Sequence, residues 1–144
     1  MKILVTGANG FLGRVVCNNL FLQGYQPIAC VRQVQQQAYF KERGISCYQG
    51  SWEDPLFGER VLNHVEVILH LAGGGKANRP SSFHDNNVKP TQTLLKLLKS
   101  YKTSVKRFIY VSSLAAVGPS TLHAPKKNDS ELHFPKAPVD CTIV

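Results

Sequence analysis

Three glycines, each three residues from the next, follow the first hydrophobic run of the chain and constrain its fold more than any other feature. Residues 2–6 form a short apolar run that predicts a strand, and Gly7, Gly10 and Gly13 come directly after it. Gly7 permits a sharp turn, Gly10 lets backbone N–H groups approach a ligand, and Gly13 lets the next helix pack close to the sheet. The N-terminus of that helix presents unsatisfied donors and a favourable dipole to an anion. The pattern predicts a phosphate-binding turn.

Strand and helix patterns alternate along most of the chain. This alternation predicts an α/β fold, a Rossmann-type doubly wound parallel sheet with helices on both faces. We expect about five strands in the order 3-2-1-4-5, truncated before the last strands of such a sheet. Val88, Thr91, Leu95 and Leu98 are spaced to form one buried face of a long helix. The expected strands are 2–6, 27–31, 45–48, 65–71 and 107–111, and the expected helices are 11–23, a short exposed one at 33–43, 55–63 and 82–101; residues 118–144 show no clear period.

Length and composition narrow the class of protein. The 144 residues suffice for one domain with a real core, which we place at 1–144 without a separate substrate domain. The net charge of +8 is dispersed and accompanies no nucleic-acid motif, so we expect no nucleic-acid partner. No stretch approaches the ~20 apolar residues of a membrane span, and no signal-peptide pattern begins the chain, so we expect a cytoplasmic protein. Cys17 and Cys30 lie in apolar stretches, which predicts buried thiols, and we expect no metal site.

Four segments together resemble a known family. Thr6-Gly7-Ala8-Asn9-Gly10-Phe11-Leu12-Gly13 has the G-x-x-G-x-x-G spacing of the extended short-chain dehydrogenase/reductases, the NAD(P)-dependent epimerases, dehydratases and related reductases. His70-Leu71-Ala72-Gly73 resembles the family's H-L-A-A, and Asn87-Val88-Lys89-Pro90-Thr91 resembles N-V-x-G-T with proline in place of glycine. Residues 108–118 resemble the strand that delivers a catalytic serine. The resemblance covers nearly the whole chain.

The resemblance implies a bound nicotinamide dinucleotide. Arg32 stands at the end of the second strand, where NAD-selective proteins carry an acid for the ribose 2′-hydroxyl. An arginine would instead fork onto a 2′-phosphate, so we favour NADP over NAD, with a solvated loop arginine as the alternative. Ser51 would contact the adenine edge and Trp52 its ring, although Trp52 is as readily a core residue. The other residues expected to hold the cofactor are Gly7, Asn9, Gly10, Phe11, Leu12, Gly13, Leu71, Ala72, Gly73, Asn87, Val111 and Ser112.

The family mechanism uses a serine, a tyrosine and a lysine, of which this sequence shows one. Ser113 matches the serine, with Ser112 as the runner-up. No tyrosine follows Tyr110, and counting from a nearby proline places Thr142 at the apparent tyrosine position. An aliphatic hydroxyl cannot replace a phenol as an acid/base near neutral pH, and the lysine of Y-x-x-x-K would lie past the last residue. We therefore expect the chain to be inactive alone.

Three interpretations of the function remain open. In the first, the chain is the cofactor-binding part of an oxidoreductase or of a nucleotide-sugar epimerase/dehydratase-like enzyme, shortened at its C-terminus. In the second, it is a non-catalytic NADP(H)-binding module that senses redox state or docks to a partner; in the third, it is a degraded remnant. The residues name no substrate, although Gly73–Gly75, Lys76 and the loop 118–125 would border it. The resemblance also allows a homodimer.

Overall fold

A computed structural model describes residues 1–74, 80–101, 103–113 and 138–144, and the side chains of 80–83 lie outside this description. Gly75, Lys76 and the loop 118–125, expected to border the substrate, are also outside the described residues. The elements are β1 (Lys2–Thr6), α1 (Phe11–Leu22), β2 (Gln26–Val31), the 3-10 helix η1 (Val34–Gln37), α2 (Ala38–Lys41), β3 (Ser46–Gln49), α3 (Pro55–Leu62), β4 (Val67–His70), α4 (Pro80–Ser100), β5 (Arg107–Tyr110) and β6 (Asp140–Ile143).

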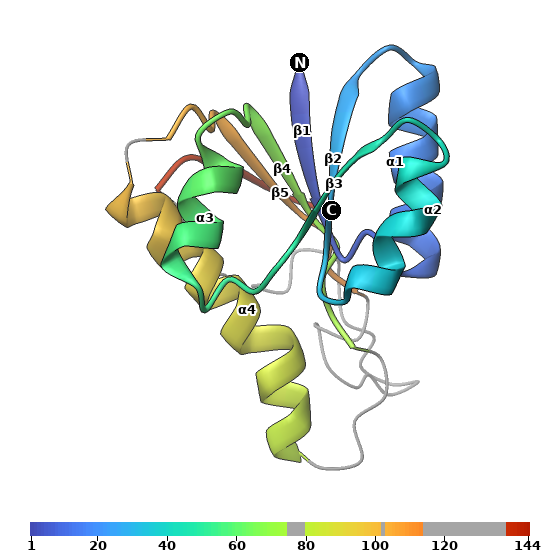
Figure 1. The fold of residues 1–144 in the computed structure, drawn as a ribbon. Helices are drawn as coiled ribbons and strands as arrows, with labels where there is room; N and C mark the ends of the chain where they lie inside the picture. The colour runs from blue at the N-terminus through green and yellow to red at the C-terminus, as the bar shows by residue number, and fades with distance from the viewer. Residues whose placement is uncertain (75–79, 102, 114–137) are drawn as a thin grey trace, which may run out of the picture.

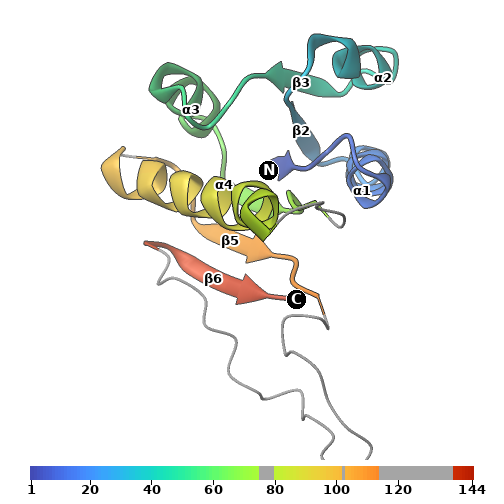
Figure 2. The same ribbon diagram turned by 90° about the horizontal axis from the view of Figure 1, so that it is seen from below.

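The strands form one parallel sheet in the order β3-β2-β1-β4-β5-β6 (Figure 1). Seen along the strands, α3 and α4 lie on one side of this sheet and α1 and α2 on the other (Figure 2). A hydrophobic cluster fills each interface, one around Ile68, Leu94 and Phe108 and the other around Val5 and Phe40. The expected Rossmann-type sheet, its order 3-2-1-4-5 and its helices on both faces are confirmed.

The expected number of about five strands is wrong, because the described residues include a sixth strand, β6. This strand pairs with β5 at the edge of the sheet, with Phe108 opposite Cys141. Asp140 and Ile143 are exposed and Cys141 is only half-buried, so four residues carry no readable alternation of apolar and polar side chains. Pairing with β5, and an ion pair of 3.1 Å between Arg107 and Asp140, accompany the strand.

Two further expectations about burial are corrected. Val88 is 36% exposed, whereas Thr91 and Leu95 are buried as expected. In Figure 1 the first turns of α4 project beyond the ends of the strands. The segment 33–43, expected to be an exposed helix, instead forms η1 and α2 and buries Phe40 completely. One aromatic residue anchors this otherwise polar segment to the sheet.

The order of the strands reverses between β1 and β4. The chain leaves β1 toward one edge of the sheet and later returns through β4 to build toward the other edge. At such a switch point the loops after the two strands diverge to opposite faces, and ligands of parallel α/β sheets bind in the crevice that this leaves. The loop after β1 holds Gly7 and Gly10, with Gly13 in the first turn of α1, and the loop after β4 holds Leu71–Gly74.

Candidate functional site

Gly7 holds the sharp turn after β1. Its φ is +65°, a left-handed conformation that side chains rarely adopt. A Cβ atom at Gly7 would lie 2.7 Å from the backbone carbonyl of Leu71, after β4. Glycine is therefore required twice, by the backbone angle and by the close approach of the two loops at the switch point.

The helix that follows begins without a cap. Gly10 occupies the N-cap position of α1, its backbone is extended, and no side chain bonds to the first N–H groups of the helix. The first turn carries no acidic residue, and the N–H groups of Phe11, Leu12 and Gly13 have no intrahelical partner. Phe11 is 90% exposed, so this end of α1 is open. The arrangement is a donor site for an anion.

Gly13 brings α1 down onto the turn. A Cβ atom there would lie 2.3 Å from the carbonyl oxygen of Gly7 and 2.6 Å from Cα of Ala8. At Gly10 the same atom would come only to 3.2 Å of the Gly7 oxygen. Packing therefore demands glycine at Gly13 far more strongly than at Gly10, whose missing side chain leaves the helix end clear.

Arg14 is a feature of the site that the sequence analysis missed. Its Nη2 donates to Oδ1 of Asn9 at 2.6 Å, and its guanidinium lies 4.5 Å from the ring centroid of Tyr39. Its Nε is buried and donates to no described residue. The signal that could have revealed it is a cation in the first turn of a helix, where the helix dipole disfavours positive charge. The position is consistent with an anion nearby.

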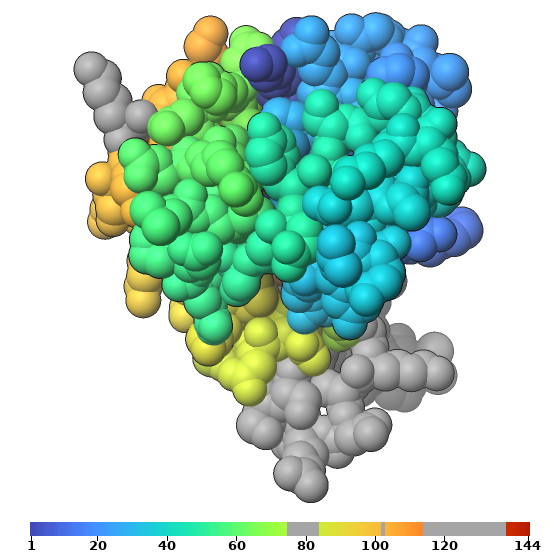
Figure 3. Space-filling view, in the orientation of Figure 1, coloured from blue at the N-terminus to red at the C-terminus, as the bar shows by residue number. Residues whose placement is uncertain are grey.

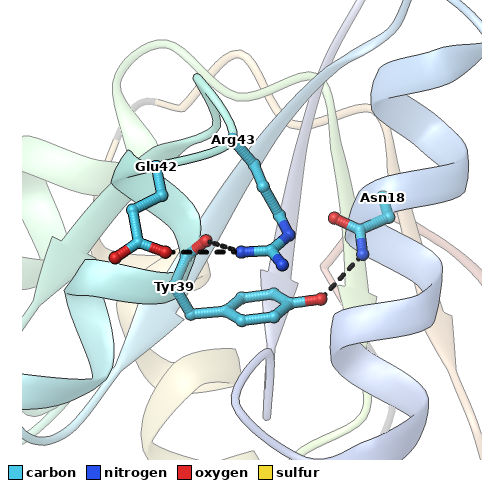
Figure 4. A network of polar contacts seen from close by, with 4 residues as sticks. All are labelled: Asn18, Tyr39, Glu42 and Arg43. Atoms are coloured by element: carbon cyan, nitrogen blue, oxygen red, sulfur yellow. Dashed lines mark hydrogen bonds and ion pairs between the residues drawn. The ribbon is translucent and has the colours of Figure 1, made fainter.

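Tyr39 connects α2 to α1 beside this turn (Figure 4). Its hydroxyl accepts a hydrogen bond from Nδ2 of Asn18 at 2.7 Å. The guanidinium of Arg43 lies 3.8 Å from the ring centroid and donates to the Tyr39 carbonyl at 2.9 Å, with the carboxylate of Glu42 at 3.8 Å. These contacts hold the Tyr39 ring in place beside Arg14, which in turn bonds to Asn9 of the glycine turn.

His70 links three elements below the site. Thr91 Oγ1 donates to the carbonyl of Asn87, so it accepts from Nε2 of His70 at 2.8 Å. Nδ1 of His70 then accepts from Oγ1 of Thr6 at 2.8 Å, and that oxygen accepts from the N–H of Ala72. Burial lowers the pKa of His70 to about 4, so the imidazole is neutral. Every polar side-chain atom in this buried series of hydrogen bonds is paired.

The loop after β4 is held by Asn87. Its Oδ1 accepts from the N–H of Gly74 at 3.0 Å, and its Nδ2 donates to the Gly74 carbonyl at 3.3 Å. A Cβ at Gly73 would lie 2.9 Å from the same Oδ1. Gly73 and Asn87 were both expected at the cofactor, and the structure brings them together with Leu71 and Ala72 opposite Gly7.

The residues expected at the adenosine end lie on separate loops. Arg32 follows β2, is exposed, and makes no side-chain hydrogen bond or ion pair with the described residues. Ser51 is exposed and its Oγ accepts from the N–H of Glu53 at 3.2 Å. The ring of Trp52 lies 5.1 Å from that of Phe57 and packs against the core, which favours the core alternative.

The hydroxyls expected at the catalytic end lie at different levels of the sheet. Ser113 is exposed and follows the end of β5, after half-buried Val111 and Ser112. The N–H of Ser112 donates to the carbonyl of Val144 at 2.7 Å, which ties it to the backbone. Thr142 lies inside β6, level with Ile109. Ser113 therefore stands at the carboxyl edge of the sheet, and Thr142 does not.

Other kinds of site were sought in the part of the chain that the structure describes. Three or more His, Cys, Asp or Glu side chains gather nowhere within these residues in a metal-binding arrangement. Cys17 and Cys30 are buried free thiols, as expected, and burial raises the pKa of each to about 12. Among the described helices, none combines the length and the apolar character needed to cross a membrane.

Known proteins share this sequence and fold. The model of the NAD dependent epimerase/dehydratase family matches residues 3–140. The ceramide reductase of Caulobacter vibrioides is 30% identical over 118 residues, which cover 82% of this chain and 36% of that protein. A photosystem II assembly factor of Cyanophora paradoxa is 29% identical over 114 residues, 79% of this chain and 35% of that protein. The UDP-glucose 4-epimerase of Bifidobacterium longum, solved with NAD+ and UDP, has a TM-score of 0.68 and 27% identity, covering 89% of this chain and 43% of that chain.

These matches agree with one another and with the site. The family model covers the chain almost from end to end, while the chain spans little more than a third of the length of these two curated relatives. The family description and the NAD+ of the solved relative support a nicotinamide dinucleotide as the cofactor of this domain type. The chain belongs to the NAD dependent epimerase/dehydratase family, as a Rossmann-type domain that covers part of its relatives' length.

Proposed function

We propose that residues 1–144 bind NADP across the switch point of the sheet and, as these residues alone, do not turn it over. The observation that carries the proposal is the uncapped N-terminus of α1, set beside a turn in which Gly7 and Gly13 have no room for a side chain. The pyrophosphate accepts from the N–H groups of Phe11 and Leu12, where the helix dipole adds to the attraction.

The preference for NADP rests on Arg32. A guanidinium is always charged and presents a fork of donors that fits a phosphate. The side chain of Arg32 is exposed and makes no hydrogen bond or ion pair with the described residues, so the 2′-phosphate does not have to displace an acid. Arg14, held by Asn9 and Tyr39 next to the turn, adds a second positive charge on the same side of the sheet. The solved epimerase holds NAD+, so the preference for NADP has to be measured in this chain itself.

These residues supply some of the groups needed for hydride transfer to or from a substrate, and they lack the acid/base group. When bound, the nicotinamide supplies hydride transfer. Asn87 and His70 hold the loop after β4, and exposed Ser113 orients a substrate oxygen at the carboxyl edge. No tyrosine occurs after Tyr110 in these 144 residues, so this polypeptide alone has no phenol in the expected position to move the proton.

Two roles are compatible with binding without turnover. In the one we favour, this domain is the cofactor-binding part of a longer oxidoreductase or nucleotide-sugar epimerase/dehydratase-like enzyme. The second is a non-catalytic module that senses redox state or docks to a partner, and the likeness to an assembly factor is the observation in its favour. The DNA downstream separates them: a Y-x-x-x-K helix encoded in any frame supports the enzyme, and its absence supports the module.

Calorimetry of the 144-residue chain tests the proposal. We expect saturable one-site binding of NADPH, weaker binding of NADH, and no oxidation of either cofactor in the presence of carbonyl compounds. The matched variant is Arg32→Asp, with Lys96→Asp on the exposed side of α4 as a charge control. Absence of NADPH binding contradicts the proposal, and equal affinity for the two cofactors removes the role given to Arg32.

A further inference from the structure

A cavity lies at the opposite end of the strands from the proposed nucleotide site. It has a volume of about 210 Å³ and opens at the amino ends of β1, β2 and β3, between the end of α1 and the end of α3. The nucleotide site lies at the carboxyl ends of the strands, roughly 17 Å away along a five-residue strand. In Figure 3 the three segments that border the cavity, the chain start, the α1–β2 connection and the end of α3, meet at the top of the view. The proposed cofactor does not use this edge.

Basic side chains border the cavity without an acid among its lining residues. Lys2, Arg60 and His64 all line it, and none makes a side-chain ion pair with a described residue. The nearby carboxylate of Glu66 accepts from the backbone N–H of Lys2 at 3.0 Å, which offsets part of the charge. Arg60 lies in the last turn of α3, where the helix dipole stabilises a cation without a partner. The lining therefore carries an excess of positive charge, which favours an anion.

Aromatic rings form the other walls. Phe21 is 44% exposed and Tyr25 is 37% exposed, and both side chains line the cavity. Tyr48 faces the same cavity, and the guanidinium of Arg60 lies 5.6 Å from the centroid of its ring. Burial of aromatic faces against a flat ligand would recover hydrophobic free energy that these side chains now forgo.

The size of the cavity limits the ligand. A cavity of roughly 150 Å³ holds a benzene molecule, and drug-sized ligands occupy roughly 300–1,000 Å³. A volume of about 210 Å³ thus suits one ring with one charged substituent and is small for a dinucleotide. A phosphomonoester carries close to two negative charges at neutral pH, so Lys2 and Arg60 attract it more strongly than they attract a carboxylate with a single charge.

We propose that this cavity binds a small aromatic phosphate, with the ring among Phe21, Tyr25 and Tyr48 and the phosphate facing Lys2, Arg60 and His64. The site is separate from the cofactor and does not depend on the function proposed above. A metabolite of this class would bind at the amino edge while a dinucleotide occupies the carboxyl edge.

Phenyl phosphate is the probe, and amide NMR of the 15N-labelled 144-residue chain is the readout. We expect the amides of Gly44, Ile45 and Tyr48 to shift together, with a Kd on the order of 1 mM. Inorganic phosphate lacks the ring and benzyl alcohol lacks the charge, so each should bind at least about five-fold more weakly. The amides of Gly10 and Leu12 report any binding at the nucleotide site, and the titration is repeated with NADPH present to fill that site.

A pair of variants completes the test. Arg60→Gln removes an exposed cation of the cavity and should raise the Kd about five-fold, while Lys96→Gln, which makes the same charge change outside the cavity, should leave it unchanged. Tyr25→Ala removes an exposed ring and should weaken phenyl phosphate but not inorganic phosphate. The proposal is overturned if the cavity amides do not shift or if inorganic phosphate binds as tightly as phenyl phosphate. It is also overturned if Arg60→Gln and Lys96→Gln have the same effect on the Kd for phenyl phosphate.

Discussion

The turn after β1 and the strands β5 and β6 lie on the same sheet but are specified in different ways. At the turn, Gly7 and Gly13 are fixed by backbone angles and by contacts with backbone atoms. At the far strands, Ser113 and Thr142 are exposed side chains, and the neighbouring β6 is a four-residue edge strand. The first region is built from main-chain geometry that tolerates almost no replacement. The second region presents its hydroxyls on exposed side chains, where sterics constrain the residue type less than at the turn.

The contrast between the two regions would be lost if the glycine turn tolerated a methyl group. Gly13→Ala places a Cβ 2.3 Å from the Gly7 carbonyl oxygen, a backbone atom that cannot yield, so we expect a loss of at least about 3 kcal/mol in the free energy of unfolding. Urea unfolding measures it. Gly58→Ala is the control, since its Cβ would meet the flexible end of Leu97, and alanine favours a helix. A similar, small effect of both substitutions would show that the turn is not sterically fixed.

His70 connects the two regions, and the pH dependence of the free energy of unfolding tests this connection. Its ring contacts Phe108 and Tyr110 of β5 while it bonds Thr6 of β1. Burial lowers its pKa from 6.5 to about 4, so below pH 6.5 the unfolded chain takes up a proton that the folded chain refuses. The free energy of unfolding should therefore fall with falling pH between 6.5 and 4, by about 2 kcal/mol at pH 5.

The control for this pH dependence is His70→Gln, which keeps a hydrogen-bonding side chain but does not titrate. Carboxylates contribute equally to both proteins, so the difference between the two curves isolates the imidazole. Parallel curves for the two proteins from pH 6.5 to 5 would show that His70 is not buried as described.

The sequence predicted the first region better than the second for a physical reason. Runs such as residues 2–6 and 27–31 are apolar because they are central strands buried on both faces, and glycines mark backbone constraints directly. Asp140–Ile143 has neither signal, since an edge strand with one half-buried residue looks like a loop. The place of this strand in the sheet is determined by its pairing with β5, and no local sequence pattern encodes that pairing.

Long-range contacts also escaped the sequence. Thr6, His70 and Thr91 appeared as a strand end, a motif residue and part of a helix face, and only folding over 64 and 21 residues joins them in one hydrogen-bonded chain. Arg14 was overlooked because its significance depends on Asn9 and on Tyr39, which arrives from α2. In contrast, Gly73 and Asn87 were found through the family motif and do meet.

The loop after β2 is expected to choose the cofactor. Arg32→Asp replaces the exposed cation after β2 with an acid, so the ratio of NADP to NAD affinity should fall about tenfold or more, since a charge-assisted bond to phosphate is lost and repulsion is gained. Calorimetry with both cofactors measures the ratio, with Lys96→Asp as the control. An unchanged ratio would remove cofactor selection from this loop.

The smallest effect is expected in the second region. Ser113→Ala removes an exposed hydroxyl, so the free energy of unfolding should change by less than about 0.5 kcal/mol and the Kd for NADPH by less than about twofold. Thermal unfolding and calorimetry check both values. A loss as large as that of Gly13→Ala would mean that Ser113 supports the fold, and the contrast between the regions would disappear.

Amide NMR of the chain during an NADPH titration will show whether the uncapped start of α1 holds the dinucleotide. We expect the N–H resonances of Phe11, Leu12 and Gly13 to move downfield and saturate together, because donors without an intrahelical partner gain a phosphate acceptor. The N–H of Arg14, already bonded to the carbonyl of Gly10 at 3.1 Å, should move less. Saturable NADPH binding that leaves Phe11, Leu12 and Gly13 unmoved would contradict this role of α1.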